Sequence, residues 1–204
     1  MREPCYGIVL AGGLARRMGG GDKGLREIGG QSLLARVIDA MRPQCTGLIL
    51  SANGDVARFA GFGLPVVTDS VTGAKGPLAG LLAGLDWIAV HHPQIASAIS
   101  VPTDSPFLPA DLVARLLDIR QKKNATLACA RSGGVTHPVI ALWPIVIRSQ
   151  LREALVSEDL RKIGRFLDRH ETALEEWPIE PFDPFFNANE PCDLIKAEAI
   201  LAQR

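Results

Sequence analysis

Residues 7–24 read GIVLAGGLARRMGGGDKG, and this stretch decides the fold. Residues 7–10 form a short apolar run typical of a strand, and six glycines follow it by residue 24. Glycine adopts positive φ and lets amide N–H groups come close to a ligand. Successive free N–H groups form a concave anion site, and the arginines and lysine of the same loop add positive charge. The stretch therefore predicts phosphate binding beside the edge of a sheet.

Length and composition indicate one globular domain over residues 1–204. Hydrophobic residues make up 47% of the chain and charged residues 22%, which is ordinary for a soluble protein. The formal net charge is zero, so a whole-protein basic field for nucleic acid is excluded and the phosphate site must be local. No apolar run approaches the ~20 residues of a membrane span. The N-terminus does not read as a signal peptide, and the scattered cysteines predict reduced thiols in a cytoplasmic protein.

Strand-like and helical patterns alternate over the first two-thirds of the chain. Strands are expected at residues 7–10, 48–50, 65–68 and 98–101. Helices are expected to start after Ser32, at Pro77 and after Pro109, because a serine cap and a proline in the first turn mark helix starts. This βαβα order predicts a doubly wound α/β fold with a mostly parallel sheet.

The pattern changes near residue 125. Strand-like runs at 125–130 and 139–143 flank Gly133 and Gly134, which favours a hairpin or a short irregular excursion. A further amphipathic helix is expected over 160–167 and a last strand over 172–177. The proline-rich segment 177–191 is expected to cross the surface as a loop, and a closing helix is expected from Asp193 onward.

Polar residues follow the expected strands at their carboxyl ends. Asn53 follows the second strand, Asp69 the third and Asp104 the fourth, while the glycine loop follows the first. Ligands bind at this end of the strands in open α/β sheets, so the four loops are expected to meet at one rim. Asp104, between Pro102 and Pro106, is the strongest candidate for Mg²⁺, which takes one or two carboxylates plus substrate phosphates. A turn or helix-cap aspartate is the alternative.

Lys23 and Arg17 are the candidates to neutralise the charge of a triphosphate, Arg17 through a bidentate grip. The alternative is solvated surface charge. Asp22 is expected to pair with Lys23 or to orient it. His137 has no evident partner, and no Ser/His/Asp or Cys/His arrangement stands out.

Two phosphate-binding motifs can be tested against the chain. The P-loop pattern requires a Gly-Lys pair, which does not occur in this sequence. Gly19, Gly21 and Gly24 match the dinucleotide pattern literally, but they begin well past the strand and lead into a poor helix start. A nicotinamide-dependent oxidoreductase therefore remains only as an alternative.

The loop and the later motifs together resemble the bacterial molybdenum cofactor guanylyltransferases. The resemblance rests on Leu-Ala-Gly-Gly at 10–13, Met-Gly-Gly-x-Asp-Lys at 18–23, Pro-Thr-Asp-Ser-Pro at 102–106, His-Pro at 137–138 and Asn-Ala-Asn at 187–189. These motifs stand in family order and cover nearly the whole chain. Glu190 is a small departure, because a threonine is common before the following proline.

The resemblance implies a single nucleotidyltransferase domain over residues 1–204, with a Rossmann-like three-layer α/β/α fold and a partly mixed sheet. It implies an enzyme that transfers GMP from GTP to the terminal phosphate of molybdenum-molybdopterin, with Mg²⁺, releasing pyrophosphate. Molybdenum-insertion proteins and molybdoenzyme chaperones are candidate partners. The acceptor phosphate is already ionised at neutral pH and would attack the α-phosphorus in line, so no protein nucleophile is required.

The resemblance also assigns roles to matching residues. The nucleotide-binding set is Leu10, Ala11, Gly12, Gly13, Lys23, Asn53, Asp69, Gly80 and Asp104. The catalytic set is Lys23, Asp104 and Arg17, with Asp104 as the metal ligand. The pterin side is assigned to Asn187, Asn189 and His137.

Two alternatives stay close to this family. A cytidylyltransferase for the same cofactor carries Leu-Ala-Ala-Gly in the loop, and Gly12 favours guanine because a side chain there would narrow the room for a purine. The other alternative is a non-catalytic adaptor that binds nucleotide and delivers cofactor. The presence of both Lys23 and Asp104 argues against an adaptor.

Overall fold

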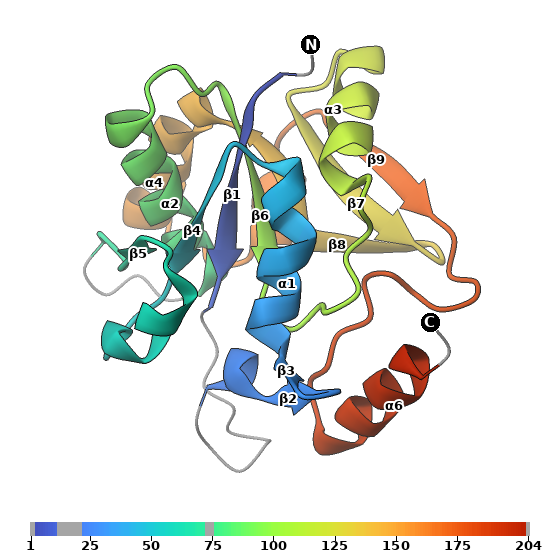
Figure 1. The fold of residues 1–204 in the computed structure, drawn as a ribbon. Coiled ribbons are helices and arrows are strands. Elements are labelled where there is room, and N and C mark those ends of the chain that lie inside the picture. The colour runs from blue at the N-terminus through green and yellow to red at the C-terminus, as the bar shows by residue number, and fades with distance from the viewer. Residues whose placement is uncertain (1–2, 12–21, 72–75, 203–204) are drawn as a thin grey trace.

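A seven-stranded mixed sheet forms the centre of the protein (Figure 1). The computed structural model describes residues 3–11, 22–71 and 76–202. The strands of the sheet, in spatial order, are β5 (Val66–Val67), β4 (Gly47–Ser51), β1 (Cys5–Leu10), β6 (Ser97–Pro102), β8 (Val135–Pro144), β7 (Leu127–Ser132) and β9 (Thr172–Trp177). Strands β5, β4, β1 and β6 run parallel, and β8 runs antiparallel to both β6 and β7. The prediction of a mostly parallel, partly mixed sheet is confirmed.

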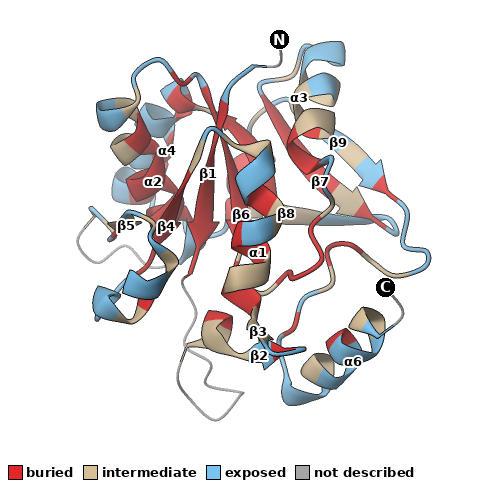
Figure 2. Ribbon diagram, viewed as in Figure 1, coloured by how far each residue is buried: buried red, intermediate tan, exposed pale blue. Residues whose placement is uncertain are grey.

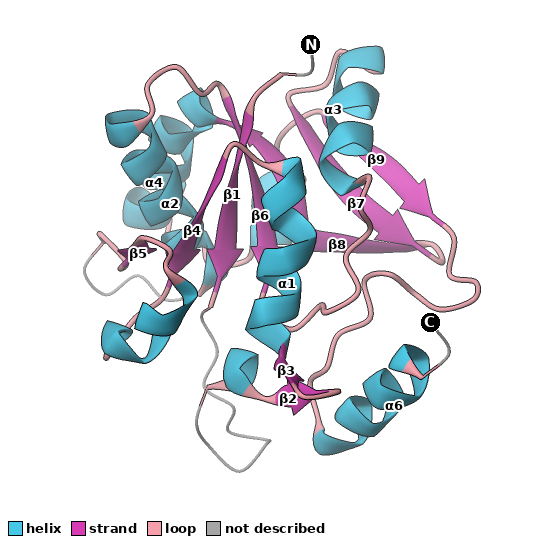
Figure 3. Ribbon diagram, in the orientation of Figure 1, coloured by secondary structure: helices cyan, strands magenta, loops and turns pink. Residues whose placement is uncertain are grey.

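Helices cover both faces of the sheet and complete three layers (Figure 3). Along the chain they are α1 (Leu33–Met41), α2 (Pro77–His91), α3 (Leu112–Lys122), α4 (Arg148–Ser157), α5 (Ile163–Leu167) and α6 (Pro191–Leu201). One apolar core lies between the sheet and α2, α4 and α5, and a second lies between the sheet and α1 and α3. All of β1 is buried, with Ile8 in the first core and Val9 in the second, as the alternation of side chains along a strand requires (Figure 2).

Local sequence signals set the ends of the main helices. Ser32 caps α1 by accepting a hydrogen bond from the amide of Ala35 at 3.1 Å, as the sequence predicts. Pro77 is the first residue of α2, where its missing N–H costs no helical hydrogen bond. Helix α2 approaches the sheet closely at two glycines. A Cβ on Gly84 would lie 2.8 Å from Ile8, and one on Gly80 would lie 2.5 Å from Ser51 Oγ.

The turn between β7 and β8 is the hairpin that the two glycines predict. Gly133 and Gly134 have φ of 53° and 78°, and positive φ at both central residues is the requirement of a type I′ turn. The strands on either side pair in antiparallel register. This hairpin is the point at which the parallel pattern of the first half ends.

Several elements differ from the sequence prediction. Helix α4 and the small hairpin of β2 (Glu27–Ile28) and β3 (Gln31–Ser32) were not predicted. Helix α5 is only five residues long, and Leu160 lies outside it. Helix α6 begins at Pro191 rather than at residue 193. Within the described ranges, no helix is long and apolar enough to cross a membrane.

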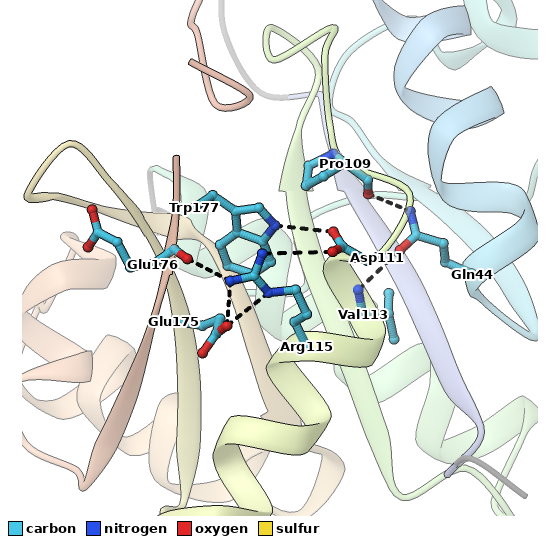
Figure 4. A network of polar contacts seen from close by, with 8 residues as sticks. All are labelled: Gln44, Pro109, Asp111, Val113, Arg115, Glu175, Glu176 and Trp177. Atoms are coloured by element: carbon cyan, nitrogen blue, oxygen red, sulfur yellow. Dashed lines mark hydrogen bonds and ion pairs between the residues drawn. The ribbon is translucent and has the colours of Figure 1, made fainter. Parts of the chain in front are cut away.

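A polar network fixes the chain that follows β6 (Figure 4). Arg115 on α3 donates to the Glu175 carboxylate at 2.8 and 2.6 Å and to the Glu176 carbonyl at 2.6 Å, and its guanidinium lies 4.2 Å from the centre of the Trp177 ring. Trp177 Nε1 donates to Asp111 at 3.2 Å, so this helix-start aspartate binds β9 instead of capping its own helix. The network ties the edge strand β9 to the start of α3.

Gln44 holds the same helix start from the opposite direction. Its Nε2 donates to the carbonyl of Pro109 at 2.9 Å, and its Oε1 accepts from the amide of Val113 at 3.1 Å (Figure 4). The segment between β6 and α3 is therefore anchored just beyond Asp104.

The C-terminal segment forms a third, smaller apolar cluster at the carboxyl end of the sheet. Helix α6 lies beside β2 and β3 (Figure 1). Ile28, Phe107 and Ala197 are buried there, and the amide of Gly29 donates to Glu198 at 3.2 Å. This packing places α6 next to the segment that follows Lys23.

Candidate functional site

Asn53 and Asp69 form a reciprocal hydrogen-bonded pair at the carboxyl ends of β4 and β5. Asn53 Nδ2 donates to Asp69 Oδ2 at 2.7 Å, and the amide of Asp69 donates to Asn53 Oδ1 at 3.0 Å. The pair fixes the orientation of the Asn53 amide group, because each of its ends has a partner. The two strand ends that the sequence predicted to meet therefore do meet here.

A cavity of about 150 Å³ opens beside this pair. Its lining residues come from the ends of three strands and from the start of α2: Leu10, Ser51, Ala52, Asn53, Asp69, Gly76, Pro77 and Gly80. We call this cavity the strand-end pocket. Leu10, Asn53, Asp69 and Gly80 of the expected nucleotide-binding set all line it, while the amide of Ala11 is held by the carbonyl of Ser51 at 2.8 Å.

A second group of polar side chains gathers around Lys23. The Lys23 ammonium donates to the carboxylate of Asp104 and to the side-chain oxygen of Asn189. The carbonyl of Asp104 accepts from the amide of Ala188 at 2.9 Å. Ser105 Oγ donates to Asn187 Oδ1 at 3.2 Å. We call Lys23, Asp104 and Asn189 the Lys23 cluster, and it joins three segments that are far apart in the sequence.

Asp104 has one carboxylate oxygen that fits a metal ion. Its Oδ2 contacts Lys23, whereas its Oδ1 is buried and has no hydrogen-bond partner among the described residues. A buried polar atom without a partner is costly. Carboxylate oxygen is the ligand that hard divalent cations prefer, so a cation bound at Oδ1 would satisfy this atom.

Asp22 orients Lys23 indirectly. Its Oδ1 accepts from the amide of Gly24 at 3.1 Å and thereby caps the 3-10 turn Lys23–Leu25. Its Oδ2 binds Arg58 Nε at 3.1 Å. Of the two expectations for Asp22, the structure supports orientation of Lys23 and not a direct pair with it. No pattern in the sequence indicates that Arg58 takes part.

His137 has partners, contrary to the prediction from its isolation in the sequence. Its Nε2 lies 2.7 Å from Ser132 Oγ, and Ser132 Oγ donates to Asp183 Oδ1 at 2.8 Å. The hydroxyl has one proton and gives it to the carboxylate, so His137 Nε2 must donate, and in the neutral imidazole this leaves Nδ1 unprotonated. Burial lowers the pKa of His137, which favours this neutral form. Because serine stands between histidine and aspartate, this arrangement does not activate a nucleophile.

The remaining expected residues divide into two groups. Gly12, Gly13 and Arg17 lie outside the described residues. We call residues 183–189 the returning segment, and two of the expected pterin-side residues, Asn187 and Asn189, belong to it. The third, His137, contacts this segment, because its ring lies 4.9 Å from that of Phe185. Gly24 lies within the 3-10 turn Lys23–Leu25, which leads into the β2–β3 hairpin. That path does not open the helix that a dinucleotide fingerprint requires.

Comparison with known proteins identifies the family. Residues 7–173 match the profile described as "MobA-like NTP transferase domain". A relative from Rhodopseudomonas palustris (strain BisB5), named molybdenum cofactor guanylyltransferase, is 61% identical over 193 residues, covering 95% of this chain and 92% of its own.

Solved structures share the fold at low sequence identity. The molybdopterin-guanine dinucleotide biosynthesis protein A of Archaeoglobus fulgidus aligns with a TM-score of 0.76 at 22% identity, covering 98% of this chain and all (100%) of its own. Rv0371C of Mycobacterium tuberculosis, solved in complex with manganese, aligns with a TM-score of 0.66 at 17% identity over 98% of this chain and 100% of its own. The family profile and the close relative together show that the chain belongs to the molybdenum cofactor guanylyltransferases, within the MobA-like NTP transferases.

Proposed function

We propose that this protein transfers GMP from GTP to the terminal phosphate of molybdenum-molybdopterin and releases pyrophosphate. The observation that carries the proposal is the Lys23 cluster, in which the Lys23 ammonium group contacts Asp104, whose other carboxylate oxygen is buried and has no hydrogen-bond partner among the described residues. A lysine ammonium group together with a carboxylate oxygen that can bind a cation suits a metal-bound triphosphate. The name of the 61% identical relative supports guanine as the base and molybdenum cofactor as the acceptor.

The strand-end pocket is the proposed site of the nucleoside. Asn53 and Asp69 hold each other in place and would present their remaining hydrogen-bonding capacity to the nucleoside. Leu10 and Gly80 line the same pocket. Ala11, Gly12 and Gly13 follow Leu10 in the sequence and are proposed to contact the nucleotide. Gly80 lets α2 approach β4 closely at this pocket, because a Cβ there would lie 2.5 Å from Ser51 Oγ.

The Lys23 cluster is the proposed site of the phosphates. Asp104 would hold a divalent cation, proposed to be Mg²⁺, and the manganese complex of the mycobacterial neighbour supports a divalent ion. When bound there, such an ion would neutralise part of the negative charge of the triphosphate. Lys23 and Arg17 would bind phosphate oxygens and stabilise the charge that develops on departing pyrophosphate. No side chain need act as nucleophile, because positioning of an ionised acceptor phosphate suffices.

The returning segment is the proposed pterin side. Asn187 and Asn189 reach the rim from this segment, and the Ser132–Asp183 contact holds His137 in the tautomer with an unprotonated Nδ1. An unprotonated ring nitrogen accepts hydrogen bonds of the kind that pterin N–H groups donate. Since Asn189 also contacts Lys23, we propose one nucleotidyltransferase domain over residues 1–204. Molybdenum-insertion proteins and molybdoenzyme chaperones are its proposed partners.

Pyrophosphate release tests the reaction. The purified chain is incubated with each of the four nucleoside triphosphates, with and without molybdenum-molybdopterin and with and without Mg²⁺. We expect release only with GTP, acceptor and divalent cation together. Preference for CTP would identify a cytidylyltransferase, and tight GTP binding without release would identify an adaptor. Binding of NADH without binding of Mg²⁺-GTP would identify an oxidoreductase.

A further inference from the structure

Arg58 physically joins the strand-end pocket to the Lys23 cluster. It lies on the 3-10 helix Val56–Phe62. Its Nη2 donates to the carbonyl of Asn53 at 2.9 Å, and its Nη1 donates to the carbonyl of Asp55. Its Nε donates to the carboxylate of Asp22 at 3.1 Å. One guanidinium group therefore holds the loop that carries Asn53 and the residue that caps the turn of Lys23.

This contact is more constrained than an ordinary surface ion pair, which contributes little. The Asp22 side chain is only 10% exposed, and that of Arg58 is 29% exposed. The guanidinium of Arg58 also lies 4.3 Å from the centre of the Phe59 ring, and Phe59 is fully buried. A planar group with three acceptors and a ring contact has a fixed orientation, so the positions of Asn53 and Asp22 are fixed relative to each other.

We propose that Arg58 is a positioning residue that sets the spacing between the nucleoside site and the phosphate site, and thereby couples binding of the base to binding of the triphosphate. The proposal rests on the proposed function, since it takes GTP to span both sites. A ligand with two parts gains affinity when its two sites are held at the right separation. Guanosine, which lacks phosphates, uses only the nucleoside site.

The test compares guanosine with Mg²⁺-GTP on the full chain. Titration calorimetry measures both affinities for the wild type, Arg58→Gln, Asp22→Asn and the double variant. Asp22→Asn keeps an oxygen that can accept from the amide of Gly24 but removes the charge opposite Arg58. We expect each single variant to weaken GTP binding about tenfold and guanosine binding less than about twofold, because both variants lose the charge-assisted hydrogen bond between Arg58 and Asp22. The double variant is expected to lose no more than either single variant, because both remove the same link.

Arg58→Lys and Arg120→Gln serve as the comparison variants. Lysine keeps the charge but cannot reach three acceptors at once, so it is expected to behave as glutamine does. Arg120 likewise bridges separate segments, binding Glu3 and Ser97 at 2.9 Å each, but at the amino ends of the strands. Arg120→Gln is therefore expected to leave both affinities unchanged. Thermal unfolding of every variant shows which of them are folded.

Two results would overturn the positioning role. Equal weakening of guanosine and GTP in Arg58→Gln would mean that Arg58 only shapes the nucleoside loop. A double variant about a hundredfold weaker for GTP than the wild type would mean that Arg58 and Asp22 act independently. Failure of the proposed function would appear separately, as a wild-type chain that does not bind Mg²⁺-GTP or does not release pyrophosphate.

Discussion

The two halves of the rim are built in different ways. The strand-end pocket is made by neighbouring strand ends of the parallel sheet, and its central pair, Asn53 and Asp69, lies 16 residues apart in the sequence. The Lys23 cluster joins Lys23 to Asp104 and to Asn189, which lie 81 and 166 residues away. The first half follows from local order along the sheet, whereas the second depends on the return of the C-terminal segment. Substitutions in the two halves should therefore impair different steps, namely turnover in the Lys23 cluster and binding of GTP in the strand-end pocket.

The largest effect is expected from Asp104→Ala. This change removes the proposed metal ligand and leaves Lys23 without its carboxylate partner. We expect pyrophosphate release to fall by more than about 10³-fold, since charge neutralisation at the phosphates is lost. The fold should persist, which circular dichroism and the unfolding temperature report. Near-wild-type release by a folded Asp104→Ala variant would refute the assignment.

The next largest effect is expected from Lys23→Ala. Loss of one preorganised donor at a site of developing charge costs roughly 10²–10³ in kcat. The binding of guanosine should be unchanged, because Lys23 belongs to the other half of the rim. Steady-state rates with GTP and calorimetry with guanosine make the comparison. A loss of only a few-fold in kcat would mean that Lys23 does not contact the phosphates on which charge develops.

A change in the strand-end pocket should affect binding more than turnover. Asn53→Ala removes both hydrogen bonds of the Asn53–Asp69 pair. We expect KM for GTP to rise about tenfold with kcat nearly constant, as for loss of binding that is equal in ground and transition states. Initial rates over a range of GTP concentrations separate the two parameters. A fall in kcat as large as that of Lys23→Ala would erase the distinction between the two halves.

The smallest effect concerns stability and pH. Burial lowers the pKa of His137 below its ordinary value of 6.5. As pH falls through about 6.5 the unfolded chain takes up a proton that the folded chain does not, so the free energy of unfolding decreases. The neutral His137 therefore stabilises the folded chain above about pH 6.5, and this stabilisation is lost as the pH falls toward the lowered pKa of His137. Urea unfolding between pH 7.5 and 5.5 should show a shallower pH dependence for His137→Gln than for the wild type. An unchanged slope would mean that His137 does not contribute.

Strong local signals made much of the sheet and its helices predictable. Strand β1, the Ser32 cap of α1 and the glycine hairpin each follow from a few adjacent residues. Helix α4 was missed because its buried residues are few, namely Leu151, Ala154 and Leu155, on an otherwise polar segment. The β2–β3 hairpin has two residues in each strand, which is too short for a periodic pattern.

The site was predictable in the same uneven way. The meeting of Asn53 and Asp69 follows from the parallel sheet, because the carboxyl ends of its strands share one edge. No short-range pattern indicates that Arg58 binds Asp22 or that Ser132 and Asp183 surround His137. The Arg58–Asp22 and Ser132–Asp183 contacts join segments that are far apart in the sequence and that only tertiary packing brings together, whereas Ser132 and His137 lie on the two strands of one hairpin. The returning segment 183–189 was expected at the surface, yet Phe185 and Ala188 within it are buried.

The contact between Asn189 and Lys23 also affects the order in which parts of the protein fold. Contacts between residues so distant in the chain form late, because loop closure must be completed before they contribute. The parallel part of the sheet, from β1 to β6, lies within the first 102 residues, so its strands leave the ribosome before the C-terminal segment does. The Lys23 cluster cannot close until residue 189 has left the ribosome. Recovery of catalytic activity should therefore lag behind recovery of secondary structure in a refolding experiment.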